Sequence, residues 1–286
     1  MRLVCRFALA IASLSIITSI SGVVVPLKAA AIDTPLTAGP LNAPGMPKAG
    51  QIAGNTSLEQ VLLSRARANS ADLASSLANF VCRERMERFR AAHGESVGKP
   101  IDIITSNVSF ENGRERYTEI LQNNKERKSI ASISGAWSEG EYATFLNETR
   151  KVLDSGVLKL QSVTSLNGEP AGLFSFEFDQ ANSPWDLQIG SKHYPVGFLF
   201  EMWVSLKSGD IIRISRSSTS MSPETQIAEV DWLVDFGAFD VDGKTFMLPK
   251  DGVYSVTYLT SPKHEWNVLT FSDYHRFSSE VAIHFQ

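Results

Sequence analysis

Two short motifs of this 286-residue chain begin like metal sites but lack the remaining ligands. His264-Glu265 starts like the helix of a zinc protease, yet Val268 occupies the position of the second histidine. Asp240-Val241-Asp242-Gly243 resembles the start of a calcium loop, but Lys244 and Phe246 follow where further oxygen ligands are needed. We therefore expect no metal site and no cofactor, although the five scattered histidines leave open a site assembled by folding.

Motifs for nucleophilic or phosphoryl-transfer catalysis are also weak. Ser96-Val97-Gly98-Lys99 has only the spacing of a catalytic serine and lysine pair, on a segment expected to be a loop. Asp235-Phe236-Gly237 resembles a kinase element, but no glycine-rich phosphate loop accompanies it. We expect no catalytic residue and therefore a protein that is not an enzyme.

A strand expected to begin at Phe80 carries a cysteine and a run of mixed charges. Free cysteines are among the most buried residues, so we expect Cys82 in the core; a reactive thiol beside Arg83 and Arg85 is the alternative. The run from Arg83 to Arg88 mixes both signs, which is typical of a solvated strand face. Its small net charge, in a chain of net charge −4, indicates no binding to nucleic acid.

Large apolar side chains, most of them aromatic, occupy alternate positions of several segments between residues 174 and 258. This two-residue period predicts strands with one buried and one solvated face. The candidate ligand-binding residues lie on the buried face: Phe174, Phe176, Phe178, Tyr194, Phe198, Phe200, Met202, Trp232, Phe236, Tyr254 and Tyr258. They either form a filled core beneath covering helices or line a cavity for a hydrophobic ligand.

Two helices and a series of hairpins must position these side chains. Ser57-Leu58-Glu59-Gln60 fits a capping box, which predicts a helix from Ser57 to about Asn79. A second helix is expected between a cap at residues 138–141 and a stop at Gly156. Tight antiparallel turns are expected at four glycines that tolerate positive φ, in Asn112-Gly113, Asn167-Gly168, Ser208-Gly209 and Asp242-Gly243. A last strand is expected to hold Val281, Ile283 and Phe285.

The N-terminal part of the chain has the features of an export signal followed by a leader. Arg2 and Arg6, an apolar run and Ala29-Ala30-Ala31 have the order of a secretory signal peptide, which predicts removal of residues 1–31. Cleavage after Ser21 and an uncleaved membrane anchor are the alternatives. Residues 32–56, rich in proline and alanine, predict a disordered leader, and residues 57–286 predict a single β-rich domain. We expect a periplasmic or extracellular protein that contacts the membrane only through its signal peptide before cleavage.

The order of these segments resembles the lipoprotein-carrier fold of LolA-like and LolB-like proteins. The resemblance rests on the export signal, the helix leading into Phe80-Val81-Cys82, the hairpin from Met202 to Arg213, and the segment from Val234 to Pro249. The chain also resembles an uncharacterised family of exported bacterial proteins with an element like Gly140-Glu141-Tyr142 before the sheet. The resemblance implies an α+β, mostly β fold: a large curved antiparallel sheet, or half-barrel, covered on its concave face by two helices.

Three functions follow from this sequence, in order of preference. The first is an exported binding protein that holds a lipid or acyl-chain-like ligand in an apolar groove between sheet and helices. The second is a non-catalytic interaction or scaffold domain with a filled core, which recognises an envelope protein partner. The third is a hydrolase whose site is assembled by the fold.

Overall fold

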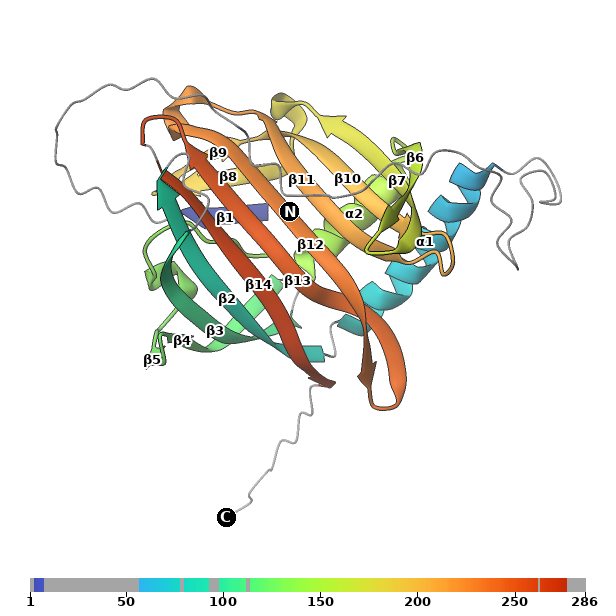
Figure 1. The fold of residues 1–286 in the computed structure, drawn as a ribbon, viewed down its shortest axis with the longest axis horizontal. Coiled ribbons are helices and arrows are strands. Elements are labelled where there is room, and N and C mark those ends of the chain that lie inside the picture. The colour runs from blue at the N-terminus through green and yellow to red at the C-terminus, as the bar shows by residue number, and fades with distance from the viewer. Residues whose placement is uncertain are drawn as a thin grey trace, which may run out of the picture.

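An open antiparallel sheet of eleven strands makes up most of the molecule (Figure 1). The computed structural model describes residues 3–7, 57–77, 80–92, 98–111, 114–261 and 263–276, the first of these as backbone only. Along the sheet, the strands are in the order β5 (Lys125–Glu126), β4 (Arg114–Gln122), β3 (Lys99–Glu111), β2 (Phe80–Ala92), β14 (Lys263–Arg276), β13 (Lys244–Tyr258), β12 (Ile227–Val241), β11 (Ile211–Ser220), β10 (Gly197–Ser205), β7 (Glu169–Phe178) and β6 (Lys159–Leu166).

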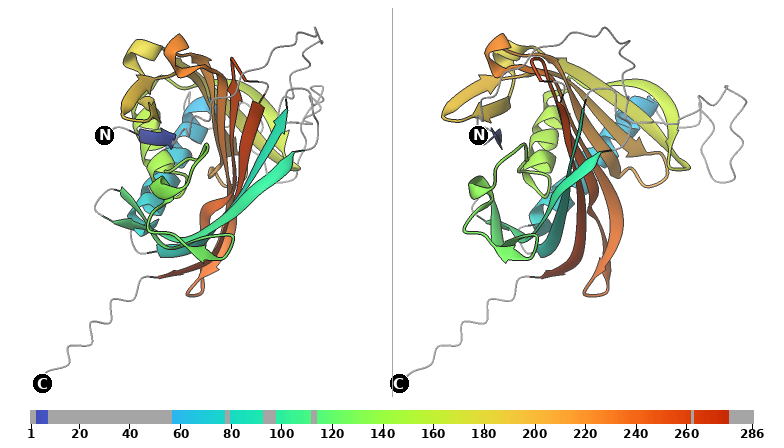
Figure 2. Two further views of the ribbon diagram at one scale, coloured as in Figure 1. Left: turned by 90° about the vertical axis from the view of Figure 1, so that its left-hand side faces the viewer. Right: turned by 60° about the vertical axis from the view of Figure 1, so that its left-hand side comes forward.

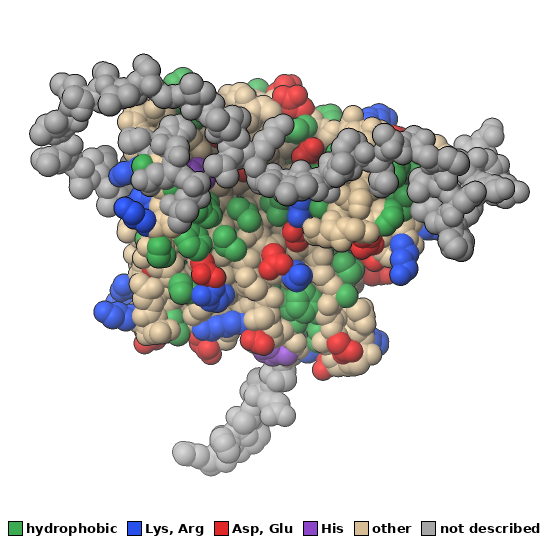
Figure 3. All heavy atoms as spheres, viewed as in Figure 1, with side chains coloured by type: hydrophobic (Ala, Val, Ile, Leu, Met, Phe, Trp, Pro, Cys, Tyr) green, Lys and Arg blue, Asp and Glu red, His purple; other side chains and the backbone are tan. Residues whose placement is uncertain are grey.

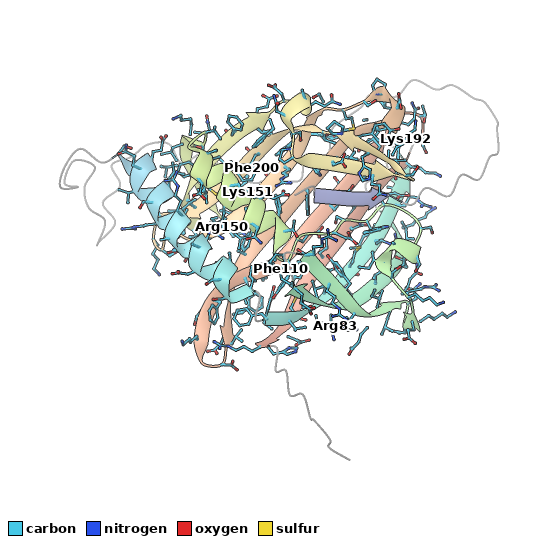
Figure 4. The ribbon with its side chains drawn as sticks, turned by 180° about the vertical axis from the view of Figure 1, so that it is seen from behind. Arg83, Phe110, Arg150, Lys151, Lys192 and Phe200 are labelled. Atoms are coloured by element: carbon cyan, nitrogen blue, oxygen red, sulfur yellow. The ribbon has the colours of Figure 1, made fainter. Side chains whose placement is uncertain are left out.

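Both long helices lie on the same face of this sheet. They are α1 (Leu58–Leu77) and α2 (Thr144–Ser155), and the sheet curves around them in Figure 2. Figure 4, seen from the opposite side to Figure 1, shows both helices in front of the strands. The predicted fold class, mostly β with a large open antiparallel sheet and two helices, is therefore confirmed. Among the described residues, neither helix combines the length and apolarity needed to cross a bilayer.

A small second sheet and three short 3-10 helices complete the fold. The small sheet contains β1 (Leu3–Phe7), β8 (Trp185–Ile189) and β9 (Lys192–Pro195), with β1 parallel to β8. The 3-10 helices span Ile130–Ser132, Gln180–Asn182 and Pro223–Thr225. Tyr194 was expected on one continuous face with Phe198, but it lies on β9 and thus outside the large sheet. The rest of the expected signal peptide, the leader and the strand expected at residues 281–285 lie outside the described residues.

Local sequence signals account for several boundaries. The capping box is confirmed, because the Ser57 amide donates to Gln60 Oε1 (3.2 Å) and the Gln60 amide donates to Ser57 Oγ (3.3 Å). The turns at Asn167-Gly168 and Asp242-Gly243 are two-residue hairpins with positive φ at both positions. Gly209 also has positive φ, but it lies in a longer connection between β10 and β11. Residues 112–113 are outside the described residues.

The start of the second helix differs from the prediction. α2 begins at Thr144, and its first amides are capped by a distant carboxylate rather than by residues 138–141. Glu115 Oε1 on β4 accepts from the Ala143 amide (2.8 Å) and the Thr144 amide (3.1 Å), and Oε2 accepts from the Gly140 amide (3.0 Å). The predicted stop is confirmed, since Gly156 is the C-cap with φ of 74°.

The interpretation of residues 83–88 as a solvated strand face is wrong for two of the charges. Glu84 and Arg88 are each only 2% exposed, on the same inward face of β2 as Cys82 and Met86. The alternation of the strand, with its period of two, dictates this placement whatever the charge. Arg88 is matched by the buried Asp102 on β3, to which its Nε and Nη2 each donate at 2.6 Å. The expected core position of Cys82 is confirmed, and burial raises the pKa of its thiol.

Candidate functional site

A cleft opens between helix α1 and the strand ends beneath it. Its volume is about 360 Å³. The second half of α1 forms one wall, α2 contributes a single side chain, and the beginnings of β11 and β13 with the middle of β12 form the rest. The lining residues are Asn69, Ser70, Asp72, Leu73, Ser76, Leu146, Asp210, Ile211, Phe236, Thr245, Phe246 and Met247.

The apolar part of the cleft is continuous with the core. Leu146, Ile211 and Phe236 are buried members of the central cluster, and Leu73, Phe246 and Met247 pack against that cluster while partly exposed. The ring of Phe246 meets the buried ring of Phe80 edge-on, with centroids 5.0 Å apart. An apolar molecule in the cleft would therefore contact side chains that are already part of the core.

Polar groups surround the apolar part of the cleft. Asn69 Nδ2 on α1 donates to Oδ1 of Asp210 (2.7 Å), which precedes β11, and this hydrogen bond spans one end of the opening. Asp72, Ser76 and Thr245 complete the polar lining. A few polar groups around an apolar interior are typical of small-molecule sites.

Helix α1 is held on both sides of the cleft. Near the first half of the helix, Arg67 donates to the Leu153 carbonyl from Nε (3.1 Å) and Nη2 (2.6 Å), and Glu59 Oε2 accepts from the Leu160 amide (3.0 Å). At its C-terminal end, Tyr142 Oη donates to the Leu77 carbonyl (3.3 Å). Between these anchors, the cleft separates α1 from the strands.

The β10–β11 turn approaches α1 so closely that only glycine fits there. A Cβ atom at Gly209 would lie 2.4 Å from the Cβ of Arg65, and the φ of Gly209 is +81°. Real Cβ atoms do not approach that closely. The packing of this turn against α1 therefore fixes one boundary of the cleft next to Asp210.

The eleven predicted ligand-binding residues form one packed region, of which a single member reaches the cleft. Those with at most 1% exposure are Phe174, Phe198, Phe200, Met202, Trp232 and Tyr254. Those that are half-buried are Phe176, Phe178, Tyr194 and Tyr258. Phe236 is 7% exposed and lines the cleft. Ring contacts join many of the others, such as the Phe178 and Phe198 rings at 4.7 Å.

A buried ion pair links α2 to the middle of this aromatic region. Arg216 on β11 donates from Nη2 to Oε2 of Glu148 on α2 (2.7 Å), and both side chains are at most 6% exposed. The guanidinium also lies over the rings of Phe145 (4.3 Å) and Phe198 (5.1 Å). The sequence analysis missed this pair. Its available signal was the alternation along β11, which puts Arg216 on the same face as the buried Ile214.

Buried carboxyl groups gather where the segment before α2 meets β2 and β4. Glu84 and Glu141 are 2% and 1% exposed, and Oε2 of each has no hydrogen-bond partner among the described residues. Burial first, and then the nearby charge of Glu115, raise the pKa of Glu141 to about 8. The pKa of Glu84 is also raised, first by burial and then by the charge of Glu141. The Ser138 hydroxyl donates to Glu141 Oε1.

The two short motifs that begin like metal sites fall on a strand and a turn, while Ser96 and Val97 lie outside the described residues. His264 lies on strand β14, and the Asp240–Gly243 segment forms the β12–β13 turn. His193 Nδ1 lies 2.5 Å from Oδ2 of Asp186 on the small sheet. Among the described residues, no group of three His, Cys, Asp or Glu side chains is placed to hold a metal.

One further match to a catalytic motif is present in the sequence. Ser96 stands in a Gly-x-Ser-x-Gly sequence from Gly94 to Gly98, the spacing of an esterase nucleophile elbow. Such an elbow joins a strand to a helix. Here the motif is preceded by β2 and followed by the antiparallel strand β3 rather than by a helix, and residues 93–97 themselves lie outside the described residues.

Comparisons with known proteins give distant similarity in structure alone. No protein-family model matches the chain, and no curated protein matches it. Among solved structures, the chain is similar to the Mycobacterium tuberculosis lipoprotein LppX, with 14% sequence identity and a TM-score of 0.27. The alignment covers 75% of this chain and 94% of that chain. At this identity and TM-score, the similarity carries no information on ligand or activity.

Proposed function

We propose that this chain is a non-enzymatic, exported binding protein that holds a hydrophobic ligand, such as an acyl chain, in the cleft beneath α1. The observation that carries the proposal is the cleft itself, with about 360 Å³ of space and an apolar part continuous with the core. This volume falls within the roughly 300–1,000 Å³ typical of small-molecule sites. Export rests on the signal-like N-terminus.

Burial of apolar surface supplies the binding energy in this proposal. Each methylene group moved from water to the cleft contributes about 0.8 kcal/mol, and the summed gain must exceed the entropy cost of association. The polar groups of Asn69, Asp72 and Asp210 are available to the head of an amphiphile, while Phe236, Phe246 and Met247 contact its chain. The remaining predicted aromatic residues would contact a longer chain only if the helices, α2 above all, moved away from the sheet.

The second candidate function is an interaction domain with a filled core, and the packing of the aromatic region favours it. Phe145 stacks on Trp232 at 4.5 Å between centroids, and Trp185 meets Phe198 edge-on at 5.4 Å. Such contacts fill the space between α2 and the sheet with protein side chains. A protein of this kind would purify without lipid and would bind a partner through its surface.

Native mass spectrometry after purification from the cell envelope tests the proposed function. We expect the chain to carry co-purified acyl lipid, and the delipidated chain to bind dodecanol. The variant Leu73→Trp fills the cleft from α1 and should lose both, while Ser75→Trp puts the same ring on an exposed part of the helix and should keep both. Equal binding by the two variants would show that the cleft is not the site, and a wild-type chain without lipid or dodecanol binding would favour the second function.

A further inference from the structure

The charged side chains that line the cleft beneath α1 all have the same sign. Among the described residues of this lining, the ionisable ones are Asp72 on α1 and Asp210 before β11, and none is a lysine, arginine or histidine. On the uncovered face of the sheet, by contrast, acidic and basic side chains lie next to one another (Figure 3), as in the ion pair of Arg213 and Asp235. The cleft therefore differs from that face in having acidic groups without basic groups beside them.

Neither carboxylate of the cleft is neutralised by a neighbouring side chain. In the part of the chain that the structure describes, Asp72 and Asp210 belong to no ion pair. Oδ1 of Asp210 accepts from the neutral amide of Asn69 (2.7 Å). Asp72 is exposed, and it is its backbone carbonyl that accepts from the hydroxyls of Ser75 (2.7 Å) and Ser76 (3.0 Å). Both carboxylates are therefore available to a positively charged group in the cleft.

The arginines of α1 are engaged outside the cleft. Arg67 donates to the Leu153 carbonyl from Nε (3.1 Å) and Nη2 (2.6 Å), which holds its guanidinium against α2. It lines a second pocket of about 310 Å³ between the two helices. The stem of Arg65 packs along the β10–β11 turn, with its Cβ, Cγ and Cδ within 3.1 Å of the position that a Cβ at Gly209 would take. Neither arginine therefore compensates the acidic lining of the cleft.

The C-terminal end of α1 adds to the negative potential of the cleft. Leu73 and Ser76 line the cleft from the last turns of this helix, which ends at Leu77. The carbonyl groups at the C-terminal end of a helix carry a partial negative charge, and a basic side chain in the last turn interacts favourably with it. The last turn of α1 contains no basic residue. The backbone and the side chains of α1 therefore both favour a cation at this end of the cleft.

We propose that the ligand of the cleft is an amphiphile with an apolar chain and a cationic amine head. This inference rests on the proposed function, since it names the chemical class of the ligand held in the same cleft. The apolar chain contacts Phe236, Phe246 and Met247, which are continuous with the core. The ammonium group lies at the carboxylates of Asp72 and Asp210, because its three N–H donors match their acceptor oxygens.

The same acidic groups disfavour a carboxylate or phosphate head. Such a head would lie beside two like charges, and the described lining offers no arginine or lysine to bind it. A neutral alcohol can form hydrogen bonds with the polar lining but gains no ionic attraction. An ion pair at a partly exposed position typically changes affinity by roughly two- to fivefold. We therefore expect dodecylamine to bind about five- to tenfold more tightly than dodecanol, and dodecanoate to bind more weakly than dodecanol.

Amphiphiles with the same chain and different heads separate this inference from the proposed function. Isothermal titration calorimetry of the delipidated chain at pH 7 and low salt, with each amphiphile below its critical micelle concentration, should give the order dodecylamine, dodecanol, dodecanoate. If none of the three binds, the proposed function fails, and this inference fails with it. If dodecanol binds and dodecanoate binds as tightly as dodecylamine, the proposed function stands and the cationic ligand is ruled out.

Two isosteric substitutions test whether the carboxylates of the cleft cause the preference for an amine. Asp72→Asn with Asp210→Asn should lower the affinity for dodecylamine to that for dodecanol and leave the affinity for dodecanol within about two-fold. The matched control, Glu126→Gln with Glu177→Gln, removes two charges from exposed positions on β5 and β7 and should keep the preference. A preference that persists in the asparagine variant would overturn the inference. An equal loss in the control would also overturn it, because the net charge of the chain would then attract the amine.

Discussion

At the scale of single residues, the buried carboxyl of Glu141 makes the stability of the fold depend on pH. Its pKa in the folded chain is about 8, well above the ordinary value of 4.5, mainly because burial disfavours the charged form. The folded state therefore binds this proton more tightly than the unfolded state does. Stability is then highest below pH 4.5 as far as this group is concerned, and it declines as pH rises from about 4.5 to about 8.

Glu141→Gln should remove most of this dependence, because the amide is neutral at every pH. We expect the free energy of unfolding of the wild type to fall by roughly 1–3 kcal/mol between pH 5 and pH 8, and that of the variant to change less. Urea unfolding followed by circular dichroism at several pH values measures both. Glu177→Gln, at an exposed position on β7, should behave like the wild type. Free energies of unfolding that fall equally with pH in the wild type and in Glu141→Gln would contradict a raised pKa at Glu141.

Removing one member of the Arg216–Glu148 pair should lower stability more than replacing both members by apolar side chains. Arg216→Met leaves the buried Glu148 carboxylate without the one cationic partner that it has among the described residues, which typically costs about 3–5 kcal/mol of stability. Adding Glu148→Leu removes the orphaned charge and should recover much of that loss. Urea unfolding of the wild type, both single variants and the double variant measures the coupling. A double variant less stable than Arg216→Met would show that the unpaired charge of Glu148 is not the main cause of the lost stability.

At the scale of elements, the sequence predicts what depends on neighbours along the chain. The capping box at Ser57, the stop at Gly156 and the turn at Asp242-Gly243 each need only a few adjacent residues, and all three are confirmed. The cap of α2 could not be found this way, because its acceptor is Glu115, which precedes Ala143 by 28 residues.

The sequence analysis did not predict the buried charges or the cleft, for a related reason. Residue type predicts exposure for Glu84 and Arg88, whereas strand alternation dictates burial, and only the position of Asp102 across the sheet shows how Arg88 is neutralised. The cleft combines residues of two helices and three strand regions, several of them polar. Only Phe236 of the predicted aromatic residues belongs to it, so a search for alternating aromatic positions finds the packed core rather than the opening.

The contact between α1 and the β10–β11 turn can be tested at Gly209. Gly209→Ala places a Cβ against Arg65 at a position of positive φ, so it should lower stability through both strain and collision. Gly168→Ala is the matched control, because Gly168 has a similar φ of +84° but no atom within 4 Å of an added Cβ. We expect a loss of about 1 kcal/mol in the control and of ~2–4 kcal/mol at Gly209, measured by urea unfolding. Equal losses of stability at Gly209 and Gly168 would mean that the β10–β11 turn can shift to accept the added Cβ without displacing α1.

At the scale of the whole molecule, the sheet separates two surfaces with different chemistry. One face is covered by helices and has the cleft beneath α1, while the other is uncovered and carries partly exposed apolar side chains such as Val253. Side chains of successive strand residues point to opposite faces, so a residue such as Val253 faces away from the helices while the adjacent Tyr254 is buried beneath them. A substitution on one face therefore leaves the other face largely unchanged.

Independence of the two faces leads to a prediction about the proposed binding site. Val253→Lys, on the uncovered face, should retain dodecanol affinity within about two-fold, because distant sites without shared partners act additively. Leu73→Trp, in the cleft, should lose dodecanol binding. Native mass spectrometry of both variants measures the binding, and urea unfolding shows whether each variant keeps its fold. If Val253→Lys also lost dodecanol binding while its unfolding curve stayed that of the wild type, the uncovered face would have to shape the cleft through the sheet, and the two faces would form one functional unit.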